Sequence, residues 1–382
     1  MRIGSIVIAV SLSFFPAAAW AELAISANDG KQLRAGDPTP RTPDSISVID
    51  LKAYPPRVIG SLQVPAAMIG PPNAVAVSKD ESFAIVTASQ KYNPADPAHP
   101  DADDTVSVVD LTNPAQPRLL QTIASGAGAS GVAINRAGTL VLVAAKGEDA
   151  VIAFALAGKK LSPAGRVDLG KGAGPTDVVF APDGRTAYAV AWGVTQIMEL
   201  AVEGSRVTRT GKDVVTGRQP YGAVVTPDGK FLLNTNLGGA LNGYGAGTLT
   251  MVDLKTHTLA LSVEAGRVTE HVALSPDGKY ALVVLANGAA TVKSDPNYDS
   301  VRGILKIYAV APGKLTEVAQ ASSCHWSQGA AWSDDGRLVL MQCATERTVE
   351  VYRFDGKTLT HDPAAALTFE SRPGAIATRN SR

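Results

Sequence analysis

Asp177, Glu270 and His271 are the residues of this sequence whose types and spacing best suit acid–base chemistry. They precede copies of a short turn-like motif, of which Ser-Pro-Asp-Gly at 275–278 is the clearest. Four residues before the first turn residue, most copies have glycine or alanine, but two have Asp177 and His271. Carboxylates and imidazoles can transfer protons. A titratable group where the repeat needs only a small residue therefore indicates a candidate catalytic site.

The position one residue earlier is polar or aromatic in all six copies of the motif. Its occupants are Asn73, Ser130, Thr176, Tyr221, Glu270 and Gln328. One hypothesis makes Glu270, His271 and Asp177 catalytic and the other residues ligand-binding. A divalent metal ion would then be held by Asn73, Asp177 and Glu270. The alternative is that these side chains only hydrogen-bond neighbouring strand ends around a water-filled channel.

The motif recurs along the chain with a nearly constant period. Its first residue falls at 78, 135, 181, 226, 275 and 333, so the steps are 57, 46, 45, 49 and 58 residues. Each repeat reads as four short strands separated by turn residues. In the fourth repeat the strands are expected at 219–225, 231–236, 249–254 and 259–264. A period of this size with several short strands predicts a β-propeller.

The two ends of the chain supply a further blade. Residues 371–378 resemble the residues that lead into and form the first strand of the other repeats. The other three strands of a repeat do not follow them. Matching strands are expected at 23–28, 45–51 and 57–64. One blade built from both ends closes the ring and leaves few unpaired strand edges. The sequence therefore predicts an all-β, seven-bladed propeller with four-stranded blades, the last closed by N- and C-terminal strands.

The longest connections are all expected on one face of the propeller, because successive strands alternate in direction. They lie at 29–44, 90–104, 237–247 and 286–302. Trp192 and Asn236 end second strands on this face, and His325 and Trp326 precede the first strand of the sixth blade. Long loops on a rigid scaffold commonly carry function. We therefore expect these four residues to contribute to ligand binding.

The chain has two cysteines, Cys324 and Cys343, nineteen positions apart. A disulfide between them is permissible in an exported protein, and two buried thiols are the alternative. A bond would hold the loop that presents His325, Trp326 and Gln328, and it would contribute about 3 kcal/mol to stability. No motif specifies a cofactor, so a divalent metal ion is the one cofactor hypothesis.

Composition and the first residues indicate where the protein works. The formal net charge is zero and no basic cluster occurs, so nucleic-acid binding is not expected. Residues 6–15 are apolar, and Ala19 and Ala21 form a cleavage pattern before Glu22. The sequence predicts a signal peptide at 1–21, with an uncleaved anchor as the alternative, and one propeller domain at 22–382. The mature protein should be secreted or periplasmic and should not span a membrane.

The repeats resemble the YVTN family of seven-bladed propellers. They are also similar to lactonase-type propellers and to the propeller subunits of quinoprotein amine dehydrogenases. The resemblance rests on the Pro-Asp-Gly turns at 181–184, 226–229 and 275–278 and on the strands at 45–51 and 105–111. These residues make turns and packing contacts, so the resemblance implies a fold and export, and no catalytic motif is carried over.

Three functions are compatible with these features. The first is an exported propeller that binds a small molecule or a periplasmic protein through its looped face. The second is a lactonase-type hydrolase in which Glu270, His271 or Asp177 activates water, with or without a metal ion. The third is a non-catalytic subunit of a periplasmic redox complex.

Overall fold

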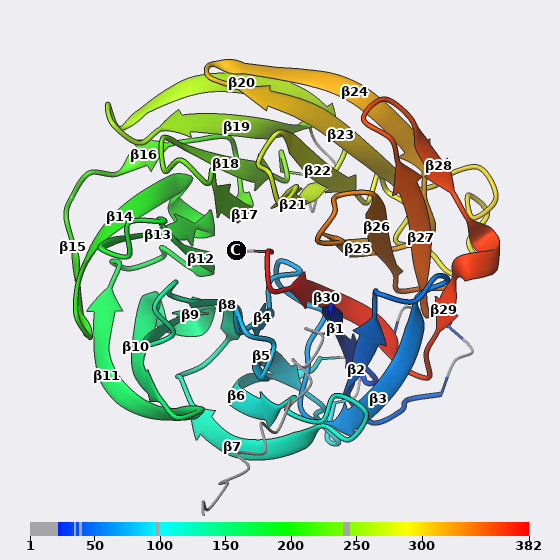
Figure 1. Ribbon diagram of the computed structural model, residues 1–382, viewed down its shortest axis with the longest axis horizontal. Helices are drawn as coiled ribbons and strands as arrows, with labels where there is room; N and C mark the ends of the chain where they lie inside the picture. The colour runs from blue at the N-terminus through cyan, green and yellow to red at the C-terminus, as the bar shows by residue number, and fades with distance from the viewer. Residues whose placement is uncertain (1–21, 34–35, 38–39, 97–98, 240–244, 382) are drawn as a thin grey trace, which may run out of the picture.

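Seven antiparallel sheets stand around a common axis in the computed structural model (Figure 1). The structure describes residues 22–33, 36–37, 40–96, 99–239 and 245–381. The predicted signal peptide at 1–21 lies outside the described residues. The all-β class and the seven-bladed ring are confirmed.

Each blade runs from an inner first strand to an outer last strand, and we number the blades in chain order. Blade 1 contains β4 (Val75–Val77), β5 (Phe83–Lys91), β6 (Asp101–Asp110) and β7 (Arg118–Ala124). Blade 2 contains β8 (Ala129–Ile134), β9 (Leu140–Ala145), β10 (Ala150–Ala157) and β11 (Lys160–Asp168). Blade 3 contains β12 (Pro175–Phe180), β13 (Thr186–Ala191), β14 (Gln196–Glu203), β15 (Arg206–Arg209) and β16 (Val214–Val215). Blade 4 contains β17 (Pro220–Val225), β18 (Phe231–Asn236), β19 (Gly247–Asp253) and β20 (Thr258–Gly266). Blade 5 contains β21 (Thr269–Leu274), β22 (Tyr280–Leu285), β23 (Ile304–Ala311) and β24 (Lys314–Ser322). Blade 6 contains β25 (Ser327–Trp332), β26 (Leu338–Cys343), β27 (Thr348–Phe354), β28 (Leu359–His361) and β29 (Leu367–Thr368). Short 3₁₀ turns occur at Lys146–Glu148, Trp192–Val194 and Pro363–Ala365.

Blade 7 joins the two ends of the chain, as the sequence predicts. Its strand order is β30 (Arg372–Thr378), β1 (Leu23–Asp29), β2 (Ser45–Asp50) and β3 (Arg57–Gln63). β1 pairs antiparallel with both β2 and β30, so Ile25 faces Val48 on one side and Ala377 on the other. Figure 1 shows the C-terminal β30 beside the N-terminal β1 next to the axis. The ring is therefore closed by backbone hydrogen bonds between chain ends.

The hydrophobic core is divided among the spaces between neighbouring blades. In β2, Ile46 and Val48 pack against blade 1, whereas Ile49 packs against blade 6. Alternate side chains of one strand thus enter two different interfaces, because successive side chains of a strand point to opposite faces. Burial on both faces explains why the third strands read as apolar runs.

The repeated turn has a packing role between blades. In blade 4, Asp228 accepts hydrogen bonds from the Thr226 hydroxyl and the Lys230 amide, which stabilises the turn. Gly278 of blade 5 has φ +71°, and a Cβ there would lie 2.7 Å from the Pro227 ring of blade 4. The Pro-Asp-Gly sequence therefore forms the turn and packs it against the next one.

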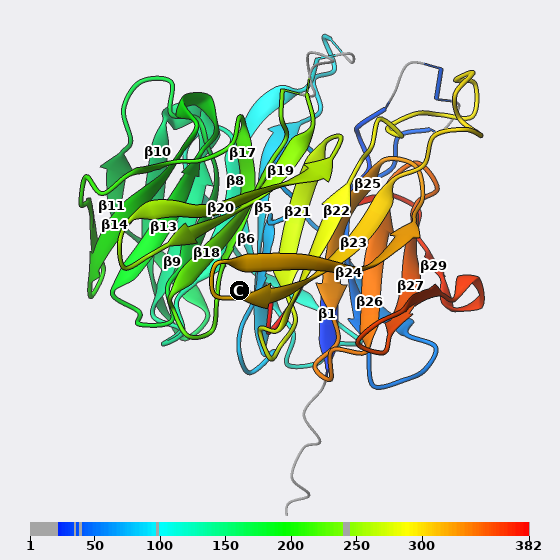
Figure 2. The ribbon, with the colours of Figure 1, turned by 90° about the horizontal axis from the view of Figure 1, so that it is seen from above.

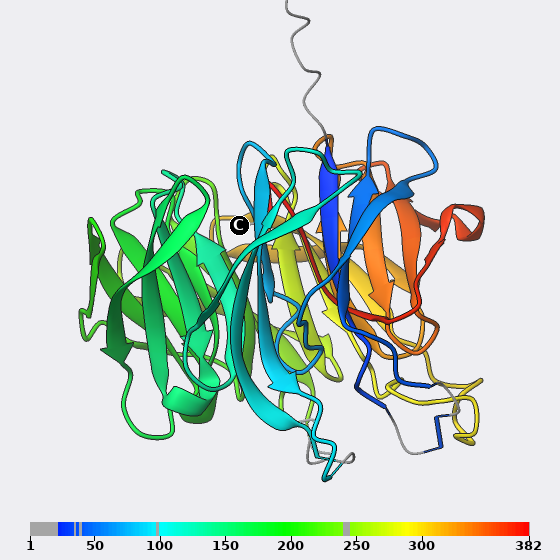
Figure 3. The ribbon, with the colours of Figure 1, turned by 90° about the horizontal axis from the view of Figure 1, so that it is seen from below.

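The two faces of the ring differ in the length of their connections (Figures 2 and 3). The connections after β1 and β5, in their described residues 30–33, 40–44, 92–96 and 99–100, and the connection 286–303 extend from one face, which we call the looped face. The opposite plain face carries turns such as 275–278 and the beginning of β1. Within the described residues, no helix has the length and apolar character needed to cross a membrane.

Candidate functional site

The first strands of neighbouring blades are tied together by buried polar side chains from second strands. In three blades a small first-strand residue lies opposite a polar one: Ala74 and Thr87, Gly222 and Thr235, Gly329 and Gln342. Each polar side chain donates to a backbone carbonyl of the next blade. Thr235 bonds to Glu270 and Gln342 bonds to Ala375, both at 2.9 Å, and Thr87 bonds to Ser130. One polar group thus links each of these blades to its neighbour.

Asp177 and His271 make the same kind of link from the first strand itself. Their second-strand partners are Val190 and Val284, which cannot hydrogen-bond to the next blade. The Asp177 carboxylate instead accepts the Ala223 amide of blade 4 at 3.0 Å. The His271 Nε2 donates to the blade 6 carbonyl of Ala330 at 3.0 Å. Both side chains are buried, and inter-blade hydrogen bonding accounts for their presence without catalysis.

Asn73 and Asp177 meet across the channel. The Asn73 Nδ2 donates to the Asp177 Oδ2 over 2.6 Å, which joins blade 1 to blade 3. This contact passes over Gly131 of blade 2, where a Cβ would lie 2.3 Å from the Asp177 Oδ1. The Asn73 amide also lies next to Gly222 of blade 4, where a Cβ would be 3.2 Å from its nitrogen. Glycines at these strand entries therefore allow two side chains to close the channel.

Tyr221 forms a second contact across the channel. Its phenol has a backbone hydrogen bond with Gly70, so blade 4 reaches the entry to blade 1. Burial raises the pKa of the Tyr221 phenol far above its usual range, and the nearby Glu270 carboxylate raises it further. Tyr221 consequently remains protonated and can donate a hydrogen bond at neutral pH.

Ser130 lies beside the same contact. A Cβ on Gly70 would come within 2.7 Å of the Ser130 hydroxyl. This hydroxyl is buried and lacks a hydrogen-bond partner among the described residues. A buried polar atom without a partner costs free energy. Because Ser130 is 3 % exposed, ligand contact by it stays a prediction.

Lys146 supplies a positive charge at the looped-face rim. Its backbone amide bonds to Gly128, and its side chain passes Gly174, so it lies near the entries to β8 and β12. The Lys146 ammonium lies 4.4 Å from the centre of the Trp192 ring. Burial lowers the pKa of this ammonium. Within the described part of the chain, Lys146 forms no ion pair with a carboxylate. It is therefore a cation that a negatively charged ligand could bind.

Three other residues predicted to bind a ligand are buried. The Thr176 hydroxyl donates to the Tyr221 carbonyl at 2.9 Å, which is another inter-blade link. Asn236 is fully buried and donates to the Thr248 hydroxyl at 3.0 Å. Gln328 is buried at the beginning of β25. Their contacts belong to the scaffold beneath the channel mouth, and ligand contact by them stays a prediction.

His325 and Trp326 lie in a separate cluster under the long connection of blade 5. The His325 ring stacks on Tyr298 with centroids 3.6 Å apart. Its nitrogens contact the Glu346 carboxylate at 2.5 Å and the Tyr298 carbonyl at 2.7 Å. Trp326 packs with Met68 and Ala344 and is 5 % exposed. Both rings therefore hold loops in place, and Trp326 offers a ligand little surface.

The predicted disulfide between Cys324 and Cys343 is present, with the two Cα atoms 5.6 Å apart. It joins the entry of β25 to the end of β26 in blade 6. Cys324, Cys343 and Glu350 are near enough to one another to resemble a metal site. Sulfur atoms bonded to each other cannot act as thiolate ligands, so this group does not suit a metal ion.

The metal site predicted at Asn73, Asp177 and Glu270 does not fit the geometry. The Asn73 nitrogen faces the Asp177 carboxylate, and the Ala223 amide occupies the same oxygen. A divalent cation needs several oxygen atoms directed at one point. We therefore derive no chemistry from a metal at this position.

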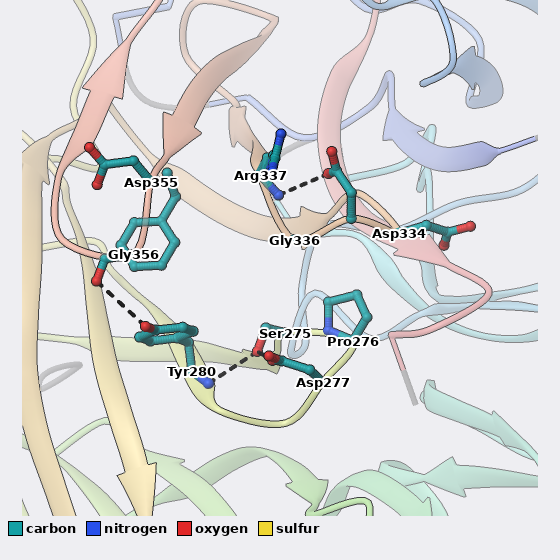
Figure 4. Close-up of a pocket in the computed structure, with 11 residues that line it drawn as sticks. Ser275, Pro276, Asp277, Tyr280, Asp334, Gly336, Arg337, Asp355 and Gly356 are labelled. Carbon is teal, nitrogen blue, oxygen red and sulfur yellow. Dashed lines mark hydrogen bonds between the residues drawn. The ribbon is translucent and has the colours of Figure 1, made fainter.

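The plain face has a cavity of about 270 Å³ between blades 5 and 6 (Figure 4). Tyr280 lies between the two turns and donates to the Gly356 carbonyl at 3.5 Å. The nearby carboxylates serve the turns themselves. Asp335 accepts the Arg337 amide at 2.9 Å, and the amides of Thr358 and Lys357 lower the pKa of Asp355. The cavity contains none of the residues that the sequence predicts as site residues.

Comparison with known proteins agrees with this architecture. Residues 70–238 match the family described as Lactonase, 7-bladed beta-propeller. The chain is a seven-bladed propeller, and less than half of it is similar to this family. The matched part includes Ser130, Lys146, Asp177 and Tyr221, whereas Glu270 lies beyond it. No curated protein sequence matches the chain.

Solved structures similar to this propeller share its fold at low sequence identity. A candidate 6-phosphogluconolactonase from Bacteroides uniformis is 18 % identical with a TM-score of 0.71, covering 94 % of this chain and 99 % of its own. One from Bacteroides fragilis is 16 % identical with a TM-score of 0.70, covering 95 % and 99 %. Hydrazine synthase from Kuenenia stuttgartiensis is 18 % identical with a TM-score of 0.58, covering 77 % and 79 %. At these identities the similarity establishes the fold alone.

Proposed function

We propose that this protein binds a small anionic ligand, of the sugar-acid or lactone class, at the channel mouth on the looped face. The observation that carries the proposal is Lys146, a partly buried ammonium held over Trp192 without a carboxylate partner among the described residues. An ammonium in such a place is a suitable contact for a carboxylate or phosphate. The lactonase family match directs the proposal toward lactones and their hydrolysis products.

Other polar side chains at the strand entries provide candidate contacts for hydroxyl groups of the ligand. Tyr221 offers a phenol that stays protonated. Glu270 is partly exposed and offers a carboxylate acceptor. Beneath them, the contact between Asn73 and Asp177 blocks the channel. The ligand would therefore be held at the rim and would not pass through the ring.

Replacing Lys146 with methionine should weaken binding of 6-phosphogluconate by about 10- to 100-fold, since a charged hydrogen bond contributes about 1.5–3 kcal/mol. Isothermal titration calorimetry with 6-phosphogluconate and gluconate measures this effect and the contribution of the phosphate. The matched control is Lys314→Met at the exposed beginning of β24, which should leave the Kd unchanged. Equal affinities in Lys146→Met and wild type would contradict the proposal.

The pH dependence of binding gives a second measurement at Lys146. Because burial lowers the Lys146 pKa, the ammonium loses its proton at a lower pH than an ordinary lysine. Binding should therefore weaken as the pH rises through this lowered pKa. Lys146→Arg keeps its charge throughout this range, so its affinity should be less sensitive to alkaline pH than that of the wild type.

Lactone hydrolysis is the second candidate function, and the family match favours it. Glu270 is the candidate general base because it is partly exposed, whereas Asp177 and His271 are buried. Glu270→Gln should lower kcat for lactone hydrolysis by about 100-fold or more. The measurement is a panel of lactones, with spontaneous hydrolysis subtracted and Glu264→Gln as the exposed control. Activity that is the same in Glu270→Gln and wild type would eliminate this mechanism.

We also propose that the protein is exported after cleavage following Ala21. The disulfide in blade 6 supports this location, because such bonds persist in oxidising compartments. A periplasmic protein partner and a role as a redox-complex subunit remain further predictions. The similarity to hydrazine synthase supports only the fold and gives no evidence for such an assembly.

A further inference from the structure

The plain face contains the seam where the two chain ends meet blades 1 and 6. The Leu23 amide at the beginning of β1 donates to the Glu81 Oε1 of blade 1 at 2.9 Å. The Glu22 carboxylate accepts the Asp334 amide of blade 6 at 2.7 Å. The C-terminal Arg379 forms an ion pair with Asp334. Residues from both ends of the chain thus contact the turns of both neighbouring blades.

The seam has more negative than positive charge. Glu22, Glu81 and Asp334 are three carboxylates, and Arg379 is their one ion-pairing cation among the described residues. The Lys79 ammonium contacts the neutral Asn380 side chain at 2.8 Å and forms no ion pair with these three carboxylates in the described part of the chain. Burial raises the pKa values of Glu22 and Glu81, and neighbouring carboxylates add to the increase. A second cation at this seam would relieve the repulsion.

Glu81 shows where such a cation would bind. Its side chain is 4 % exposed, and its Oε2 lacks a hydrogen-bond donor among the described residues. Arg379 approaches this oxygen only to 3.8 Å, beyond hydrogen-bond distance. The Oε1 is occupied by the amide of Leu23. The backbone nitrogen of Glu22 belongs to the residue directly before that amide, and it would become a cation if the chain began at Glu22.

We propose that cleavage between Ala21 and Glu22 completes this seam, with the new α-ammonium of Glu22 binding the Glu81 carboxylate. The inference depends on the proposed export. An endopeptidase of the signal-peptidase class would add water across the Ala21–Glu22 amide bond. The carboxylate product leaves with residues 1–21, and the amine product takes up a proton to become the ammonium. Maturation would then supply the missing cation and stabilise the closed ring.

Two forms of the protein test the proposal without requiring export. One begins at Glu22 after a protease removes a tag, and the other retains Trp20 and Ala21. The form beginning at Glu22 should have a melting temperature roughly 2–4 °C higher, as expected for one partly buried ion pair in a domain of this size. In the background of Glu81→Gln the difference should disappear, whereas in the control Glu264→Gln it should persist. Equal melting temperatures in the wild-type background would overturn the proposal.

Amine reactivity provides a measurement that does not depend on a Glu81 variant folding. An amine-reactive reagent should label the Glu22 α-amine at least about tenfold more slowly in the folded protein than in denaturant, because the ion pair protects it. Rapid labelling in the folded protein would also overturn the proposal. Mass spectrometry of protein from the periplasm tests export separately. A first residue other than Glu22 there would refute the cleavage site while leaving the result for the two recombinant forms intact.

Discussion

Replacing Asp177 with alanine is expected to lower the free energy of unfolding by about 3–5 kcal/mol. The Asn73 amide and the Ala223 backbone amide would both lose their acceptor in a buried environment. At roughly 2 °C per kcal/mol for a large domain, the melting temperature should fall by about 6–10 °C. Thermal unfolding followed by circular dichroism measures this change.

Two further substitutions separate the inter-blade role of Asp177 from a general effect of lost charge. In Asp177→Asn, the remaining side-chain oxygen can take the place of the Asp177 Oδ2 and accept from both Asn73 and Ala223. The Val178 amide would then lose its acceptor at the Oδ1 position. The loss should then be only about 1 kcal/mol. Asp299→Ala removes an exposed carboxylate and should change stability by less than about 0.5 kcal/mol. If Asp177→Ala were as stable as Asp299→Ala, the structural role of Asp177 would be wrong.

Removal of the disulfide is the second large effect. Cys324→Ser combined with Cys343→Ser should destabilise the protein by about 3 kcal/mol, because the bond closes a loop of about twenty residues. The loss should appear as a fall of about 6 °C in melting temperature. The neighbouring contact between His325 and Glu346 should loosen at the same time, since Cys324 adjoins His325.

Hydrogen exchange detects that local effect in the same variant. Amides at 322–328 should exchange faster in the double serine variant, whereas those of blades 2 and 3 should be unchanged. Reduction of the wild type under mild conditions should reproduce both the thermal and the exchange changes. Unaltered exchange at 322–328 would show that the bond does not hold this loop.

The sequence predicts the ring well because repetition exposes its elements. The turns at a constant period locate every first strand, and the two ends of the chain can complete only one blade. The pairing of β1 with β30 in blade 7 confirms that the two ends of the chain form one blade. The repeated strands and turns are local features, so they can be recognised without knowing how the ring closes.

The role of Asp177 and His271 in joining neighbouring blades is harder to predict, although the sequence contains part of the pattern that indicates it. Thr87, Thr235 and Gln342 each lie nine positions after the first turn residue. Where that position is Val190 or Val284, the first strand has Asp177 or His271. This exchange between two strands indicates one polar link in each of these five blades, whereas blade 2 has Gly131 and Ala144 at the two positions.

Contacts across the axis could not be predicted from the repeats. Asn73 and Asp177 belong to blades two apart, and Tyr221 reaches Gly70 three blades away along the ring. Such contacts depend on the radius of the channel and on side-chain lengths, which the period does not specify. The same limit applies to Lys146 and Trp192, which meet through two separate 3₁₀ turns.

Titration of 6-phosphogluconate into wild type, Lys146→Met and Asp177→Asn tests the central claim most directly. The claim is that the rim binds the ligand while the buried residues below it only join the blades. We predict a Kd about 10- to 100-fold higher in Lys146→Met and an unchanged Kd in folded Asp177→Asn. Lost binding in Asp177→Asn together with intact binding in Lys146→Met would contradict this account.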